Sequence, residues 1–81
     1  RAKRATLQEE FNRKIGKLAE LLRTTDQYSE RVTEIVHEIH IVHGQIQQLA
    51  IEHYYDMLSV LPPQKQAQLR EIAVEALSEP E

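Results

Sequence analysis

His53 and Met57 stand four positions apart in the stretch IEHYYDML, residues 51–58. On an α-helix, residues with this spacing lie one above the other on the same face. An imidazole and a thioether together suit nickel, cobalt or copper better than magnesium or calcium, which prefer oxygen ligands. Two ligands make a weak site, so further ligands must come from elsewhere. The alternative is that both are core side chains, with methionine as an adaptable filler and histidine satisfied by a hydrogen bond.

Three more histidines, His37, His40 and His43, follow one another at intervals of three residues. This spacing fans them around a helix, so binding of all three to one ion is strained. A pair formed by His37 and His40 can hold a metal weakly. The alternative is a group of exposed histidines at the edge of an interface.

The composition limits which classes of protein are compatible with the chain. Its 81 residues make one domain at most, and the absence of cysteine excludes disulfides and thiolate metal sites. No apolar run is long enough to predict a transmembrane helix. Without a glycine-rich phosphate loop, a nucleophile–base pair or an inward carboxylate dyad, we expect neither enzymatic activity nor a small-molecule substrate. The opening RAKRA, without an initiator methionine or signal peptide, indicates a piece of a longer protein.

The charge is divided unevenly along the chain. Residues 1–23 hold seven Lys or Arg against three Glu, which gives +4, and residues 24–81 hold three against ten Asp or Glu, which gives −7. A nucleic-acid-binding protein usually has a stronger net basic footprint. We therefore expect a basic helix beside an acidic one and no nucleic-acid partner.

The first predicted helix precedes a polar turn, TTDQYS, at residues 24–29. Glu9 with Arg13, and Glu10 with Lys14, can pair on its exposed side. Its apolar residues recur at spacings of 4, 4, 3 and 4, which is typical of one helical face: Leu7, Phe11, Ile15, Leu18 and Leu22.

The second predicted helix begins after Ser29, a suitable N-terminal cap, and continues to Leu61, where Pro62 and Pro63 stop it. Pro63 also suits the first position of a third helix. The apolar face of that third helix has five members: Leu69, Ile72, Ala73, Ala76 and Leu77. The predicted fold class is all-α, a long antiparallel helical hairpin plus a shorter C-terminal helix that folds back.

The long second helix carries two apolar stripes. One is predicted to face the first helix: Tyr28, Val32, Ile35, Ile39, Val42, Leu49, His53, Met57 and Val60. The other lies on the opposite side: His37, Ile41, Gly44, Gln48, Ile51 and Tyr55. A helix that is apolar on two sides needs two partners, and one hairpin supplies only one. The second stripe, in which Gly44 permits close approach, therefore predicts a symmetric dimer, while Leu18 and Ile39 should be buried inside the hairpin.

The hairpin geometry also predicts where further metal ligands must lie. If the turn is centred near residue 27, the numbers of antiparallel partners sum to about 54. His53 is then level with residue 1, whereas Glu9 and Glu10 are roughly 12 Å away along the helix axis. We expect the missing ligands upstream of Arg1.

Several segments of the chain resemble the CnrX-type family of periplasmic nickel and cobalt sensors, which belongs to the heavy-metal resistance group with the Spy- and ZraP-like proteins. They are GKLAELL at 16–22, the polar turn ending in Ser29, EHYYDM at 52–57, and a Leu-Pro break before a helix ending in EAL. The resemblance covers nearly the whole chain. It implies a dimeric helical hairpin with additional helices, anchored at the inner membrane and facing the periplasm.

The resemblance assigns His53 and Met57 to the metal-binding His and Met of that family. The family's other ligands, two His and a Glu, fall before Arg1 in the ungapped register, and only a gap would match that Glu with Glu9. The chain lacks the LTxxQ-type motifs of the Spy- and ZraP-like relatives.

The expected function is nickel or cobalt sensing, with zinc as a further ion, relayed to a membrane-bound anti-sigma protein. We expect a single domain over residues 1–81 that lacks its N-terminal segment and has a frayed tail at 78–81. The alternative is a helical periplasmic chaperone or structural interaction module without metal sensing.

Overall fold

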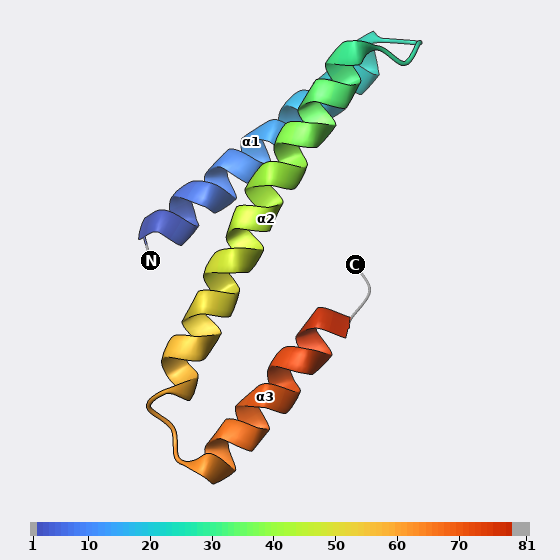
Figure 1. Ribbon diagram of the computed structural model, residues 1–81. Helices are drawn as coiled ribbons and strands as arrows, with labels where there is room; N and C mark the ends of the chain where they lie inside the picture. Colours follow the sequence, from blue (N-terminus) through green and yellow to red (C-terminus); the bar gives the residue numbers. More distant parts are fainter. Residues whose placement is uncertain (1, 79–81) are drawn as a thin grey trace. The chain divides into compact units, whose positions relative to one another are not determined.

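The computed structural model describes residues 2–78, which form three helices joined by short turns (Figure 1). They are α1 (Ala2–Thr24), α2 (Glu30–Leu58) and α3 (Pro63–Ser78). The predicted all-α class, with a long hairpin and a shorter third helix, is confirmed. Ser78 is still helical, and the rest of the predicted frayed tail, 79–81, lies outside the described residues.

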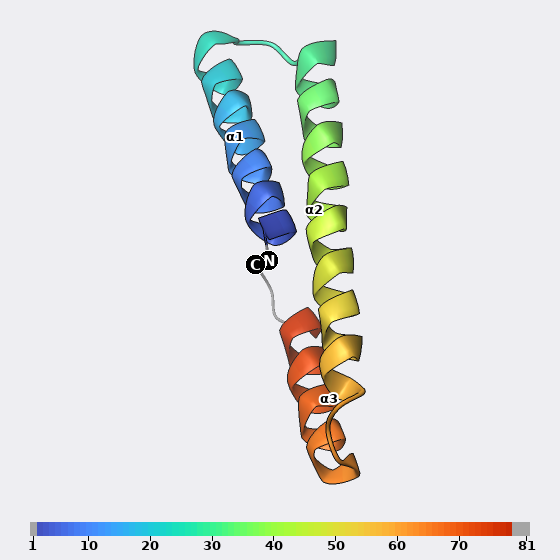
Figure 2. The ribbon, with the colours of Figure 1, turned by 90° about the vertical axis from the view of Figure 1, so that its left-hand side faces the viewer.

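The chain divides into two compact units, residues 1–49 and 50–81, and α2 runs from the first into the second. In the first unit, α1 and α2 are antiparallel (Figure 2). From α1, the residues half-buried at alternating spacings of 4 and 3 are Leu7, Phe11, Lys14, Leu18 and Leu21. From α2, the matching residues are Val32, Ile35, Ile39, Val42, Ile46 and Leu49. We call these two sets the hairpin seam; their spacing is that of helices packed side by side as in coiled coils.

The core of the seam is small. Ile35, Ile39 and Val42 are buried, and the other seam residues keep part of their surface in contact with solvent. The predicted burial is therefore confirmed for Ile39, whereas Leu18 is only half-buried.

The predicted inner face of α1 is wrong at two positions. Ile15 and Leu22 are exposed, because Lys14 and Leu21 occupy the corresponding seam positions one residue earlier. The charge of Lys14 explains why Lys14 can lie at a seam position that was predicted for Ile15. A lysine at a seam position can be accommodated where carboxylates lie close to its ammonium group.

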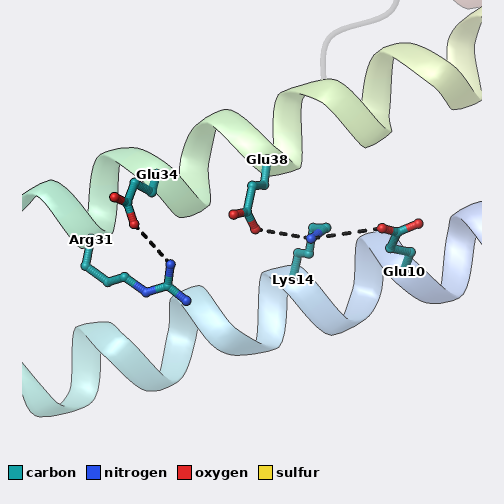
Figure 3. A network of polar contacts seen from close by, with 5 residues as sticks. All are labelled: Glu10, Lys14, Arg31, Glu34 and Glu38. Carbon is teal, nitrogen blue, oxygen red and sulfur yellow. Dashed lines mark hydrogen bonds and ion pairs between the residues drawn. The ribbon is translucent and has the colours of Figure 1, made fainter.

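Two carboxylates do lie close to Lys14 (Figure 3). Its Nζ donates a hydrogen bond to Oε1 of Glu38 on α2 at 3.1 Å, and Oε2 of Glu10 lies 4.0 Å away on α1. The pair of Glu10 and Lys14 was predicted; the cross-helix partner was not. The hydrogen bond from Lys14, followed by its charge, holds the pKa of Glu38 below the ordinary value. This cluster joins the two helices at a defined register.

The turn between α1 and α2 ends at Ser29, as predicted. The carbonyl oxygen of Ser29 accepts hydrogen bonds from the amides of Val32 at 3.1 Å and Thr33 at 3.4 Å, which starts the helical pattern. Tyr28 lies outside the helix, is exposed, and is hydrogen-bonded to the hydroxyl of Thr33. The prediction that Tyr28 belongs to the inward stripe is therefore wrong.

In the second unit, α2 ends at Leu58, three residues before the predicted end. The chain tightens there, because the amide of Leu61 binds the carbonyl of Leu58 at 3.2 Å, an i to i−3 bond. Pro62 disfavours a helical conformation at the residue before it. The side-chain amide of Gln66 donates to the carbonyls of Leu58 and Leu61, both at 3.0 Å, and so caps the end of α2.

The third helix begins at Pro63, as predicted, with the amide of Gln66 bonded to the carbonyl of Pro62 at 2.9 Å. Its half-buried residues are Gln66, Leu69 and Ala73. The remaining members of the predicted apolar face are exposed: Ile72, Ala76 and Leu77. The predicted face is thus only partly correct, because the inward side of α3 is narrower than the pattern indicated.

Candidate metal site

His53 and Met57 lie one turn apart near the end of α2, where the helix is uninterrupted. Both side chains are exposed, and Met57 keeps 37% of its surface accessible. The prediction that they form part of the core stripe is wrong, as it is for Val60, which lies in the turn after the helix and is exposed. Both side chains are therefore in contact with solvent.

The register of the hairpin explains this exposure. Lys14 binds Glu38, and the ring of Phe11 lies 5.7 Å from the ring of His43, so the numbers of level residues sum to 52–54. On α2 the hairpin seam ends at Leu49, and His53 follows one turn later, in the second unit.

Few residues close to His53 and Met57 in the second unit can serve as further metal ligands. Glu52 and Asp56 precede the two donors by one position each, so they project from other sides of the helix. The ring of Tyr54 packs edge-on against Tyr55, with centroids 4.8 Å apart. Within residues 2–78, no group of three or more His, Asp or Glu side chains is arranged to hold a metal ion. His53 and Met57 are thus two possible metal ligands on the same face of α2.

The other histidines do not extend this pair. His37, His40 and His43 are all exposed, and their spacing directs them to different sides of α2, as predicted. His43 is already in contact with another side chain, because its ring lies against Phe11 at an interplanar angle of 37°.

Glu9 and Glu10 belong to the first unit, and His53 belongs to the second. The sums of 52–54 place Glu10 level with residues 42–44 of α2. Glu10 also pairs with Lys14. The ungapped comparison, in which neither glutamate is a ligand, stays a prediction.

Comparison with known proteins adds no further constraint on the site. No family model, curated protein or solved structure matches the chain. Across residues 2–78, none of the helices combines the length and apolar character that a membrane-crossing segment requires. The function of the chain must therefore be inferred from its residues.

Proposed function

We propose that this chain is part of a periplasmic nickel- or cobalt-sensing domain, in which His53 and Met57 bind the ion. The observation that carries the proposal is the accessible pair of nitrogen and sulfur donors on one face of α2. The resemblance to the CnrX-type sensors supports it, since His53 and Met57 match metal-binding residues of that family. The ion's occupancy would be relayed to a membrane-bound anti-sigma protein.

The two side chains fit such an ion by their chemistry. A neutral imidazole binds nickel, cobalt and zinc alike, whereas a thioether is a soft ligand that hard cations reject. Residues four apart on a helix have Cβ atoms about 6 Å apart, a separation from which both can reach one ion. Two donors do not complete a site, so we propose that the remaining ligands come from chain upstream of the described residues.

Each residue has a distinct role in this proposal. His53 supplies the ligand common to all the ions, and Met57 supplies the ligand that distinguishes among them. Zinc is satisfied by four nitrogen, oxygen or thiolate ligands, while nickel and cobalt accept a further donor. Binding would draw the upstream segment onto α2 beyond the hairpin seam, and that movement would be the signal.

The proposal is tested by the NMR signal of the Met57 methyl group, because Met57 is the sole methionine in the chain. Paramagnetic nickel should broaden this signal at substoichiometric amounts. Met57→Leu should weaken nickel binding by roughly tenfold or more, as loss of a group that tunes a metal site typically does. Zinc affinity, measured by calorimetric titration, should hardly change, and His53→Ala should remove nickel from this position.

His37→Ala is the matched control, since it removes another exposed imidazole from the same helix. It should leave the broadening of the Met57 methyl signal intact. A Met57 signal that nickel does not affect, while the ring signals of His37 and His40 broaden, would contradict the proposal. It would place the ion at the other histidines and leave Met57 without a metal-binding role.

A second candidate function is favoured by the exposed apolar side chains. Large hydrophobic residues are exposed on all three helices, among them Leu22, Ile41 and Ile72. A helical chaperone or structural interaction module would use such surfaces to bind other helices or unfolded chains. This function requires no metal, so it predicts that binding of client chains is unaffected by His53→Ala.

A further inference from the structure

The last turn of α1 and the connection from α1 to α2 (Figure 2) each carry a large apolar side chain that is exposed. Leu22 keeps 62% of its surface accessible, and Tyr28 keeps 77%. Turns consist mostly of small polar residues, and apolar side chains that gather on a surface often mark a binding site for a partner. We call this end of the hairpin the tip, residues 22–33, and all of it belongs to the first unit.

A hollow of about 220 Å³ lies at the tip. Sites for small molecules usually measure about 300–1,000 Å³, so this hollow is small for such a ligand and has room for one long side chain. Three of its lining residues are apolar or aromatic, and one is acidic. The six lining residues are Leu22, Thr25, Asp26, Gln27, Tyr28 and Val32.

Asp26 gives the hollow a negative charge that the chain itself does not neutralise. Within the described part of the chain, the Asp26 side chain takes part in no hydrogen bond or ion pair. Arg23, three residues earlier, already pairs with Glu20 at 3.0 Å. Arg31, five residues later, pairs with Glu34 at 3.1 Å, and no other basic residue lies between the two arginines. The charge at the tip is therefore complementary to a cation from outside the chain.

Tyr28 gives the hollow a flat aromatic wall. Its hydroxyl group is hydrogen-bonded to that of Thr33 in the first turn of α2, which holds the ring in place. Among the described residues, no second aromatic ring packs against it. A side chain that is already held in place loses little conformational freedom on binding. The face of an aromatic ring attracts a cation, and a planar guanidinium group can stack on it.

We propose that the tip binds an arginine side chain presented by a partner protein. The aliphatic stem of that arginine packs against Leu22 and Val32. Its guanidinium group stacks on Tyr28 and donates hydrogen bonds to the carboxylate of Asp26. Arginine fits better than lysine, because its planar group can stack on a ring and bind both oxygens of a carboxylate. The proposal does not depend on metal binding, since the candidate metal site belongs to the second unit.

A peptide titration followed by NMR tests this proposal. The probe is acetyl-Gly-Arg-Gly-amide, and its control is the same peptide with citrulline, which has the shape of arginine without the charge. The arginine peptide should shift the amide signals of Leu22, Asp26 and Tyr28, with a dissociation constant of roughly 1–10 mM for a single anchoring side chain. The citrulline peptide should bind roughly fivefold more weakly, because it lacks the ion pair and the cation–π contact.

Two aspartate variants separate this site from attraction by net charge. Asp26→Asn keeps the size of the side chain but removes its charge, and it should bind the arginine peptide no better than the parent protein binds the citrulline peptide. Asp56→Asn is the matched control, because Asp56 is the other aspartate of the chain and is exposed in the second unit. It should leave the affinity unchanged. Equal weakening in the two variants would overturn the site.

Tyr28→Leu tests the aromatic wall. The position is exposed, so the variant should keep its fold and its melting temperature. It should bind the arginine peptide roughly two- to fivefold more weakly, the effect of losing an exposed cation–π contact. Unshifted tip signals at tenfold the expected dissociation constant would overturn the proposal. Tip signals that shift with protein concentration alone would also overturn it, because they would assign the hollow to a second copy of the chain.

Discussion

Lys14 occupies a seam position where the spacing of α1 otherwise brings apolar side chains. Its side chain is 17% exposed, and its ammonium group lies between Glu38, at 3.1 Å, and Glu10, at 4.0 Å. Exposed ion pairs contribute little to stability, but a half-buried lysine with a partner on the facing helix also selects a register. A slip by one residue would separate Lys14 from Glu38 and leave its charge against apolar groups. Lys14 therefore positions α1 along α2.

This arrangement predicts how stability depends on pH. The hydrogen bond from Lys14 and then its charge lower the pKa of Glu38, Arg31 and Lys17 add smaller effects, and desolvation opposes them. Because the folded chain binds its proton less readily than the unfolded chain, Glu38 stabilises the fold above its unfolded pKa. That contribution is lost as the pH falls through the folded pKa. We expect the melting temperature to fall in the acid range, and Glu38→Gln to flatten this fall.

Glu34→Gln is the control for this prediction. Glu34 pairs with Arg31 at 3.1 Å three residues earlier on α2, and both side chains are more than half exposed (Figure 3). The variant should follow the pH profile of the parent protein. If Glu38→Gln and the parent lose stability equally between about pH 7 and pH 3, the contact with Lys14 does not stabilise the hairpin.

Among the elements, the helices themselves were predictable and their inward faces less so. Pro63 fixed the start of α3 by its lack of an amide hydrogen, and Ser29 marked the start of α2. The faces depend on tertiary partners that the apolar pattern does not contain. The apolar pattern favours Ile15 over Lys14 for the seam, because it does not show that Glu38 lies opposite Lys14 on the facing helix. Similarly, the amide of Gln66 caps α2 at Leu58, a contact that no local pattern indicates.

The candidate metal site was likewise predictable only in part. The common face of His53 and Met57 was predictable, because a helix fixes which residues lie four apart. Their exposure was not, because it depends on how far α1 extends beside α2. The stripe that contains them is buried at Ile39 and Val42, where α1 faces it, and is exposed about three to four turns after Val42.

The revised faces of α1 and α2 lead to a stability prediction. Ile39 is 8% exposed in the hairpin seam, and Ile15 is 41% exposed beside it. Ile39→Ala should lower the free energy of unfolding by about 2–4 kcal/mol, since it leaves a cavity as well as removing apolar contacts. Ile15→Ala removes the same atoms from a partly solvated position and should cost about 1 kcal/mol or less. Urea unfolding measures the free energy of unfolding of both variants. Equal losses would mean that Ile15 is buried as deeply as Ile39.

At the scale of the whole molecule, the chain has little buried apolar surface. Among residues 2–78, the buried hydrophobic side chains are Ile35, Ile39 and Val42. Small domains with so few buried residues are marginally stable unless a ligand or partner subunit adds to their stability. The proposed metal site would supply such a contribution through His53 and Met57, and the dimer predicted from the sequence would supply one through a second copy.

Protein concentration separates these two contributions, because only dimerisation depends on it. In the absence of metal, the melting temperature should rise by about 5 °C between dilute and hundredfold more concentrated protein, since association stabilises the folded state by mass action. Ile41→Glu places a charge in the second apolar stripe of α2, which the sequence predicts to be the dimer face, and should abolish this rise. Ile72→Glu, at an exposed position on α3, should preserve it. A melting temperature independent of concentration in the parent protein would mean that the chain folds without the second copy, with nothing but the hairpin seam and α3 to stabilise it.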